Sequence, residues 1–190
     1  MYRAIWASIT ILVISGGACA EQSRAYELND RAIAALAQGN RAEAEHLYRA
    51  SIEEWDRLGA AFEAHRAVTE LNLAEVLSVG GKRQEAFPIY QRAVAVFRRV
   101  VGDRNLHTVG ALNMLGGAYL MSSDYKLGQP VFEEALRIAR ECFPADIEAA
   151  RALGGLAAIH FRENDTDAAL PLPKKVCGSR WSRPASTPWT

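Results

Sequence analysis

The sequence is short of several features that would mark a specialised class of protein. It has no net charge, because 22 Lys and Arg balance 22 Asp and Glu, and its 190 residues include only 3 cysteines and 4 histidines. A nucleic-acid binder that neutralises phosphates by charge needs a basic excess, which this chain lacks. With 49% hydrophobic residues, the composition excludes a disordered chain of low hydrophobicity and is typical of one soluble domain.

Motifs for catalysis and for metal or cofactor binding are missing as well. The four histidines lie at unrelated places and no HExxH pair occurs, so no metal site is expected. The stretch Val79–Arg83 has two glycines and a lysine, as a phosphate loop does. However, Val76 stands where the first glycine belongs, and Arg83 stands where Ser or Thr would hold magnesium. We therefore expect no enzyme activity, no cofactor and no small-molecule substrate.

Residues 1–20 lack an apolar run of the roughly 20 residues that a membrane span needs. They have one charge, Arg3, then an uncharged run from Ala4 to Ile14 and the triplet Ala18-Cys19-Ala20. This pattern predicts a signal peptide over residues 1–20, cleaved after Ala20, and hence an exported protein, periplasmic or secreted. A membrane anchor that is not cleaved and a lipoprotein acylated at Cys19 are the weaker alternatives.

The C-terminal end has its own composition. Residues 171–190 contain four prolines, four basic residues and no acidic residue, and no helical period continues there, which predicts a disordered, basic, Pro-rich tail. Residues 21–170 carry 17 basic against 22 acidic residues, a net charge near −5. Export would leave Cys142 and Cys177, for which a disulfide and two free or intermolecularly paired thiols both stay open.

What the sequence does have is a repeat of about 42 residues over residues 24–170. Each unit predicts a first helix, a polar turn and a second helix, which carries a small residue and, four residues later, an aromatic one. Small residues let two antiparallel helices approach to about 8–10 Å. The turns are Gly39-Asn40, Gly81-Lys82, Ser123-Asp124 and Asn164-Asp165; the small residues are Ala32, Ala74, Gly116 and Ala157 on the first helices and Ala44, Ala86, Gly128 and Ala169 on the second; the aromatics are Tyr48, Tyr90 and Phe132.

These units resemble the tetratricopeptide repeat (TPR), in the variety of about 42 residues found in kinesin light chains. The third unit carries the resemblance best, from Val101-Gly102-Asp103 through Ala111–Tyr119 to Phe132–Ile138. The resemblance implies an all-α solenoid of three complete and one incomplete antiparallel helix pairs, wound into a right-handed superhelix. The repeats would cover about 24–57, 66–99, 108–141 and 149–170 of a TPR domain spanning 21–170.

Some residues depart from the pattern. Arg31 stands at an apolar position, which predicts that this face of the first unit is an end exposed to water, and Glu70 likewise replaces an apolar residue. Pro173 stands where the fourth aromatic belongs, and a proline inside a helix costs about 3 kcal/mol. The fourth unit is therefore predicted to break off, leaving the apolar face of residues 147–161 exposed and open to self-association.

The resemblance also implies a binding face, because the first helices of TPR units line the concave side of the solenoid. An asparagine just before the packed leucine of a first helix often binds a ligand's backbone in TPR proteins. Asn72 matches this position and Asn113 matches it loosely. Glu75 and Ser78 follow on the same helix, and Asn29 and Arg151 would flank them. Because Arg151 is the one basic residue among these six, a basic or apolar peptide is expected rather than a C-terminal carboxylate.

The leading hypothesis is an exported TPR scaffold that binds a peptide or partner segment in its concave groove, with no catalysis, no cofactor and no nucleic-acid partner. The alternative is a regulatory or targeting TPR fragment of a larger enzyme or signalling system, of which this chain is a truncated remnant.

Overall fold

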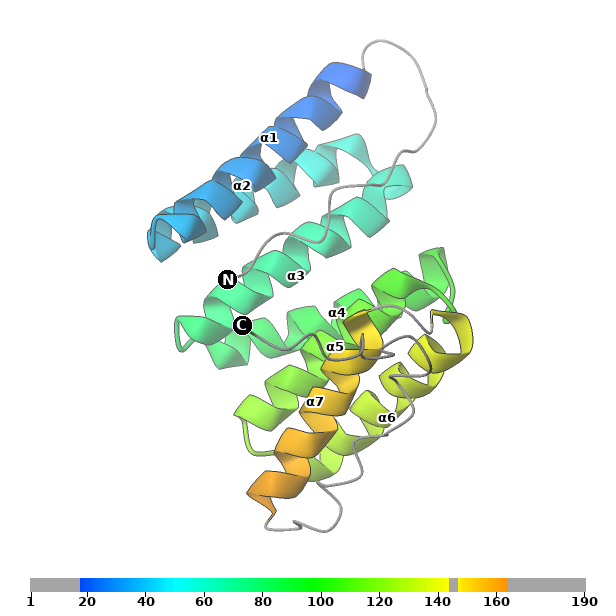
Figure 1. The fold of residues 1–190 in the computed structure, drawn as a ribbon. Coiled ribbons are helices and arrows are strands. Elements are labelled where there is room, and N and C mark those ends of the chain that lie inside the picture. Colours follow the sequence, from blue (N-terminus) through cyan, green and yellow to red (C-terminus); the bar gives the residue numbers. More distant parts are fainter. Residues whose placement is uncertain (1–17, 144–146, 164–190) are drawn as a thin grey trace, which may run out of the picture.

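The computed structural model describes residues 18–143 and 147–163, which contain seven α-helices and one short 3₁₀-helix but no strand. Figure 1 shows α1 packed with α2, α3 with α4 and α5 with α6, one pair after another, with α7 alongside α5 and α6. The predicted all-α solenoid is confirmed. In chain order the elements are α1 (Ala18–Ala37), α2 (Arg41–Leu58), η1 (Ala60–Phe62), α3 (Glu63–Val79), α4 (Arg83–Val100), α5 (Leu106–Met121), α6 (Tyr125–Cys142) and α7 (Ile147–Arg162).

The turns within the first three pairs lie where the sequence predicts them. Gly39 and Gly81 have φ angles of +81° and +85°, in the left-handed region that glycine adopts without a steric cost. Asn40 then caps α2, because its side-chain oxygen accepts a hydrogen bond from the Glu43 backbone N–H at 3.2 Å. In the third pair Ser123 takes the left-handed position with a φ of +63°. Each turn therefore ends one helix and starts the next within a few residues.

Small residues bring the two helices of each complete pair together. Ala32, Ala74, Ala44 and Ala86 are at most 1% exposed, and Gly116 and Gly128 are buried. The predicted covering aromatics, Tyr48, Tyr90 and Phe132, are 1%, 4% and 3% exposed. Ala157 is only half-buried, and its expected partner Ala169 lies outside the described residues.

Phe132 also joins the third pair to α7. A Cβ atom added at Gly116 would lie 2.9 Å from the Phe132 ring, and one added at Gly155 would lie 2.3 Å from it. The ring is thus inserted between two glycine backbones, one on α5 and one on α7. The sequence suggested the first of these contacts but not the second.

Trp55 occupies the junction between the first two pairs. Its ring is 2% exposed and stacks on His65 of α3 at a centroid distance of 5.3 Å, while Tyr26 of α1 meets it edge-on at 4.9 Å. Its indole N–H donates to Thr69 Oγ1 at 3.1 Å. Burial lowers the pKa of His65 in this cluster. Three helices therefore meet on one aromatic side chain.

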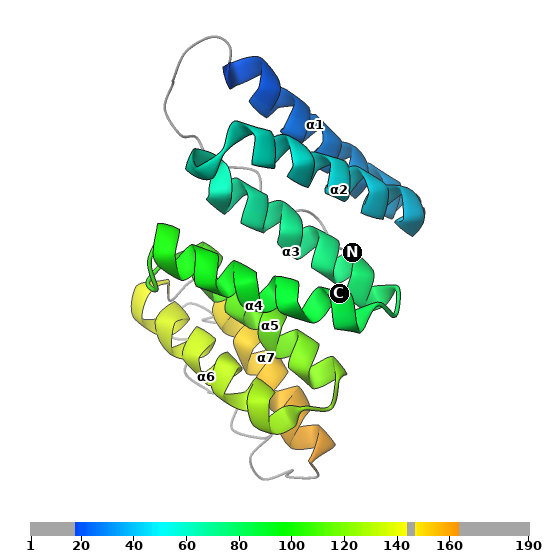
Figure 2. The same cartoon turned by 180° about the vertical axis from the view of Figure 1, so that it is seen from behind.

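Ion pairs link each second helix to the repeat that follows. These second helices lie toward the viewer in Figure 2. Lys82 Nζ lies 2.9 Å from Glu45 Oε2, and its hydrogen bond lowers the pKa of Glu45. Further along, Arg98 Nη2 lies 2.7 Å from Glu134 Oε2. Exposed pairs of this kind each contribute at most about 1 kcal/mol, so they adjust the stacking of repeats more than they stabilise the fold.

Two departures from the repeat pattern have different outcomes. Arg31 is exposed, as predicted for a terminal face. Glu70 occupies an apolar position and is nevertheless 3% exposed, because Arg92 Nη2 lies 2.9 Å and Arg66 Nη1 3.4 Å from its Oε1. A carboxylate can be buried only when cations compensate it, and here two arginines do so.

The two chain ends bear on several sequence predictions. Helix α1 begins at Ala18, before the predicted cleavage point after Ala20, and residues 1–17 lie outside the described part. Ala169, Pro171, Pro173 and Cys177 lie outside it as well. Among the described helices, none combines the length and the hydropathy required to cross a membrane.

Candidate functional site

The six predicted binding residues lie on α1, α3, α5 and α7, and the structure divides them into two groups. Asn29, Asn72, Glu75 and Ser78 lie together on α1 and α3. Asn113 and Arg151 lie together on α5 and α7. A period of 42 residues explains this division, because it puts Asn113 in line with Leu71 rather than with Asn72.

The first group joins the first two repeats through polar contacts. Asn72 Nδ2 donates to Asn29 Oδ1 at 3.3 Å, and both side chains are half-buried. Ser78 is 5% exposed, and its Oγ lies 3.9 Å from the Met121 sulfur of α5. Glu75, one turn before Val79, is exposed. Asn72 and Asn29 therefore use one hydrogen-bonding atom on each other and keep further atoms for a ligand.

Two tyrosine hydroxyls lie close to the acidic residues of this group. Burial raises the pKa of Tyr48 to about 12, and the negative charges of Glu75 and Asp30 add to the effect. Burial and the Glu75 charge also raise the pKa of Tyr90, while a hydrogen bond with Ser78 acts in the opposite direction. Since both tyrosines sense Glu75, its carboxylate lies near the ends of both rings, and both hydroxyls stay protonated near neutral pH.

Neither Asp30 nor Glu75 has a cationic partner within residues 22–143 and 147–163. Both are exposed, whereas Glu45, Glu54, Glu63, Glu70, Glu134, Glu141 and Glu148 all pair with arginine or lysine. The first two repeats thus present two carboxylates whose charge the described chain does not compensate. We name this set, Asn29, Asp30, Asn72 and Glu75, the acidic face.

The second group serves contacts between helices. Asn113 is 7% exposed, and its Nδ2 donates to the Glu148 backbone oxygen at 2.9 Å and to Glu148 Oε2 at 2.8 Å. Arg151 Nη1 lies 3.0 Å from Glu148 Oε1. The amide of Asn113 and the guanidinium of Arg151 are therefore both engaged in holding the start of α7 on α5.

Replacing Asn113 with alanine is expected to lower the free energy of unfolding by about 1–3 kcal/mol, because the buried Glu148 carboxylate loses a hydrogen-bond donor. Asn72→Ala is the matched control and should cost less than about 1 kcal/mol, since it removes one longer bond at a half-buried site. Urea unfolding followed by circular dichroism measures both. Equal losses would mean that the contact with Glu148 carries no special weight.

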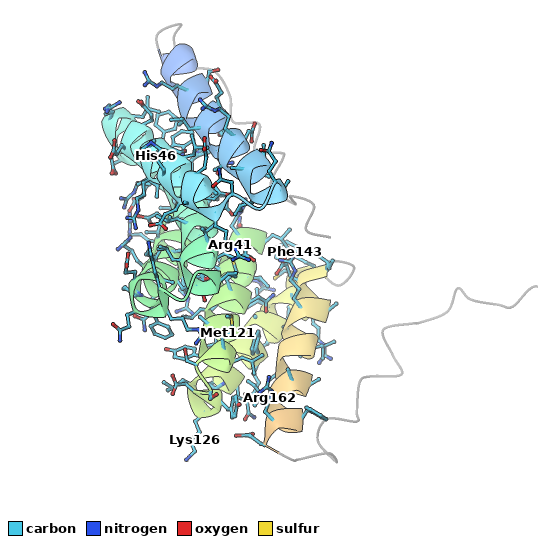
Figure 3. The ribbon with its side chains drawn as sticks, turned by 90° about the vertical axis from the view of Figure 1, so that its left-hand side faces the viewer. Arg41, His46, Met121, Lys126, Phe143 and Arg162 are labelled. Carbon is cyan, nitrogen blue, oxygen red and sulfur yellow. The ribbon has the colours of Figure 1, made fainter. Side chains whose placement is uncertain are left out.

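Sequence reasoning missed some exposed apolar side chains near this face. Val79 and Met121 end α3 and α5 at equivalent positions, 42 residues apart, and are 54% and 46% exposed. Figure 3 places Met121 and Arg162, at the ends of α5 and α7, at the same end of the molecule. The 42-residue spacing of Val79 and Met121 was the available signal. Apolar side chains therefore continue the line of first-helix ends beside Glu75.

No group of three or more His, Cys, Asp and Glu side chains in the described residues is arranged to hold a metal ion. Lys82, in the glycine-containing turn that superficially looks like a phosphate loop, pairs with Glu45. Cys142 is a free thiol whose sulfur accepts a hydrogen bond from Arg104 Nε at 3.1 Å. Its conceivable disulfide partner Cys177 lies outside the described residues.

A family comparison identifies the repeats. A family model described as tetratricopeptide repeat matches residues 22–99, 65–141 and 108–177 in three overlapping stretches. The chain belongs to the tetratricopeptide repeat family. TPR arrays generally serve as scaffolds for protein–protein interaction and are typically not catalytic. No curated protein matches the sequence.

Solved structures agree with the TPR fold. BtubC (BKLC) from P. vanneervenii superposes with a TM-score of 0.74 at 19% identity, over 87% of this chain and 69% of that one. The nearly identical, kinesin-light-chain-type TPR-like repeats from Podosopora anserina superpose with a TM-score of 0.64 at 18% identity, over 77% and 70% of the two chains. These likenesses, together with the family match, confirm the right-handed α-solenoid and its resemblance to kinesin light chain repeats.

Proposed function

We propose that this TPR protein is an exported scaffold that binds a basic, partly apolar segment of another protein along its first helices, and that it has no catalytic activity. The first helices α1, α3, α5 and α7 form the concave side of this proposed scaffold. The uncompensated charge of Asp30 and Glu75 is the observation that carries the proposal.

Chemical complementarity supports a basic ligand. A lysine or arginine side chain beside Glu75 would find two carboxylates and two protonated tyrosine hydroxyls, and the amide atoms of Asn72 and Asn29 offer hydrogen bonds to a ligand backbone. Complementary charge speeds encounter and rejects partners of like charge. The apolar Val79 and Met121 would contact apolar residues that flank the basic one. A segment that alternates basic and apolar residues therefore fits this face best.

The experiment compares pairs of short synthetic peptides that are identical except for a central Lys or Glu flanked by Leu and Met. We expect the Lys peptide to bind the full chain about tenfold more tightly at low salt, and Glu75→Lys to remove that preference. Glu53→Lys changes the net charge equally at an exposed position of α2 and should leave the preference intact. Tighter binding of the Glu peptide, or an equal effect of both variants, would refute a basic ligand at Glu75.

Export is the second part of the proposal. It rests on the arrangement of residues 1–20, a single basic residue, an apolar run and a small-x-small triplet. The mass of the mature chain recovered from the host's exported fraction tests it, because cleavage after Ala20 leaves Glu21 as the first residue.

A further inference from the structure

Helix α7 has two apolar faces, and only one of them is covered within the described residues. Ala152 and Ile159 are fully buried, and Gly155 is buried against Phe132. The adjacent face, which we name the outer α7 face, is formed by residues that are only half-buried. They are Leu153, Leu156, Ala157 and His160.

Equivalent positions of the other repeats are covered. In α3 the corresponding residues Glu70, Leu73, Ala74 and Leu77 are between 0% and 3% exposed. The element that covers them is α4, which follows α3 directly in the chain and pairs with it. The outer α7 face therefore lacks the second helix that each of α1, α3 and α5 has.

The sequence that follows α7 has the pattern of such a covering element. The small residue of each second helix stands 12 positions after the small residue of its first helix, in Ala32 and Ala44, in Ala74 and Ala86, and in Gly116 and Gly128; Ala157 and Ala169 keep this spacing. Apolar residues also recur at the same offsets from the small residue. In α4 they are Phe87, Ile89, Ala93 and Val94, and after Ala169 they are Leu170, Leu172, Val176 and Cys177.

The family match reaches the same residue. Its third stretch runs from 108 to 177, seven residues beyond the point where the sequence pattern alone ends the fourth repeat. Pro171 does not contradict this, because Pro88 and Pro130 stand at the same offset from the small residue and both lie inside helices, α4 and α6.

We infer that residues 166–177 of this chain cover the outer α7 face, with Ala169 against Ala157. The segment ends the solenoid in cis, so that neither a second copy nor a further repeat is needed to bury α7. Pro173 stands at the position of Tyr90 and Phe132, so no aromatic ring covers Ala157 and this last contact is weaker than in the three preceding pairs. The inference is independent of ligand binding at the acidic face.

The first test places substitutions inside and outside the segment in the full chain. We expect Ala169→Asp to lower the melting temperature by about 2–4 °C or more, because it puts a charge into the contact with α7. Pro173→Tyr should raise the melting temperature, since it restores both an N–H group and the missing ring. Ala185→Asp and Pro184→Tyr make the same changes beyond the segment and should have no effect. If each variant behaves like its control, the segment does not cover α7.

The second test reads the contact at Ala157 directly. In a full chain carrying Ala157→Cys, with the three natural cysteines replaced by alanine, maleimide labelling should become about tenfold faster when Ala169→Asp is added, because labelling follows the opened population. Unchanged labelling overturns the inference. So does a chain that sediments as a dimer and becomes monomeric on Leu156→Asp, because a second copy would then cover the face.

Discussion

Replacing Trp55 with alanine is expected to lower the free energy of unfolding by about 3–5 kcal/mol, the largest loss that a single substitution should cause in this protein. The ring is 2% exposed and contacts side chains of α1 and α3 as well as Phe62 of η1. Alanine leaves a cavity where three helices meet, and the surrounding backbone can close it only in part. Aromatic contacts add roughly 0.5–1.5 kcal/mol per pair to this loss.

Urea unfolding followed by far-UV circular dichroism measures the effect without relying on Trp55 fluorescence. Because each repeat of a solenoid contacts only its neighbours, hydrogen exchange should speed up in α1 and α2 and change least in α6 and α7. Trp55→Phe is the control. It keeps most of the packing and loses the hydrogen bond to Thr69, so about 1–2 kcal/mol should be lost. A loss below about 1 kcal/mol for Trp55→Ala would contradict the role of this junction.

Gly155→Ala is expected to destabilise the contact between α6 and α7 by about 1–3 kcal/mol, although alanine normally favours a helix. The added methyl group would lie 2.3 to 2.6 Å from three carbon atoms of the Phe132 ring. The ring cannot retreat freely, because the backbone of Gly116 lies against its other side. Overpacking therefore outweighs the gain in helix propensity.

The neighbouring Gly154 provides a matched control. It is exposed, and a methyl group there would meet no atom within 4 Å. Gly154→Ala should accordingly raise stability by about 0.5–1 kcal/mol. Adding Phe132→Leu to Gly155→Ala should recover part of the loss, and the double-mutant cycle gives the coupling between the two sites. If the two alanine variants shift unfolding in the same direction, Phe132 does not fill the space against α7.

Regular spacing made much of the fold predictable. The turn residues, the small residues of the first three pairs and the covering aromatics recur about 42 residues apart, and each acts within one pair of helices. Their roles follow from local requirements, a left-handed backbone at a turn and close approach of two helices, which the residue types themselves satisfy. The same regularity identified the family.

The candidate site was less predictable. Asn72 and Asn29 proved to be neighbours, which a shared face suggested, whereas Asn113 lies in line with Leu71 at a buried position and bonds to Glu148. Asp30 and the two tyrosine hydroxyls entered the site only when the helices were packed, because they come from different helices. Whether the acidic face binds a peptide stays a prediction.

By itself, the sequence determined the helices, their turns, their pairing and the family, since these depend on residue types at fixed local spacings. Only the tertiary structure decided which polar side chains are exposed and which are used inside the fold. Glu70 is buried because Arg92 of the next helix reaches it, and Glu75, five residues later, faces outward without a cation. Such differences arise from the offset between packed helices, which sets each group's burial and partner and is not written in any one stretch of sequence.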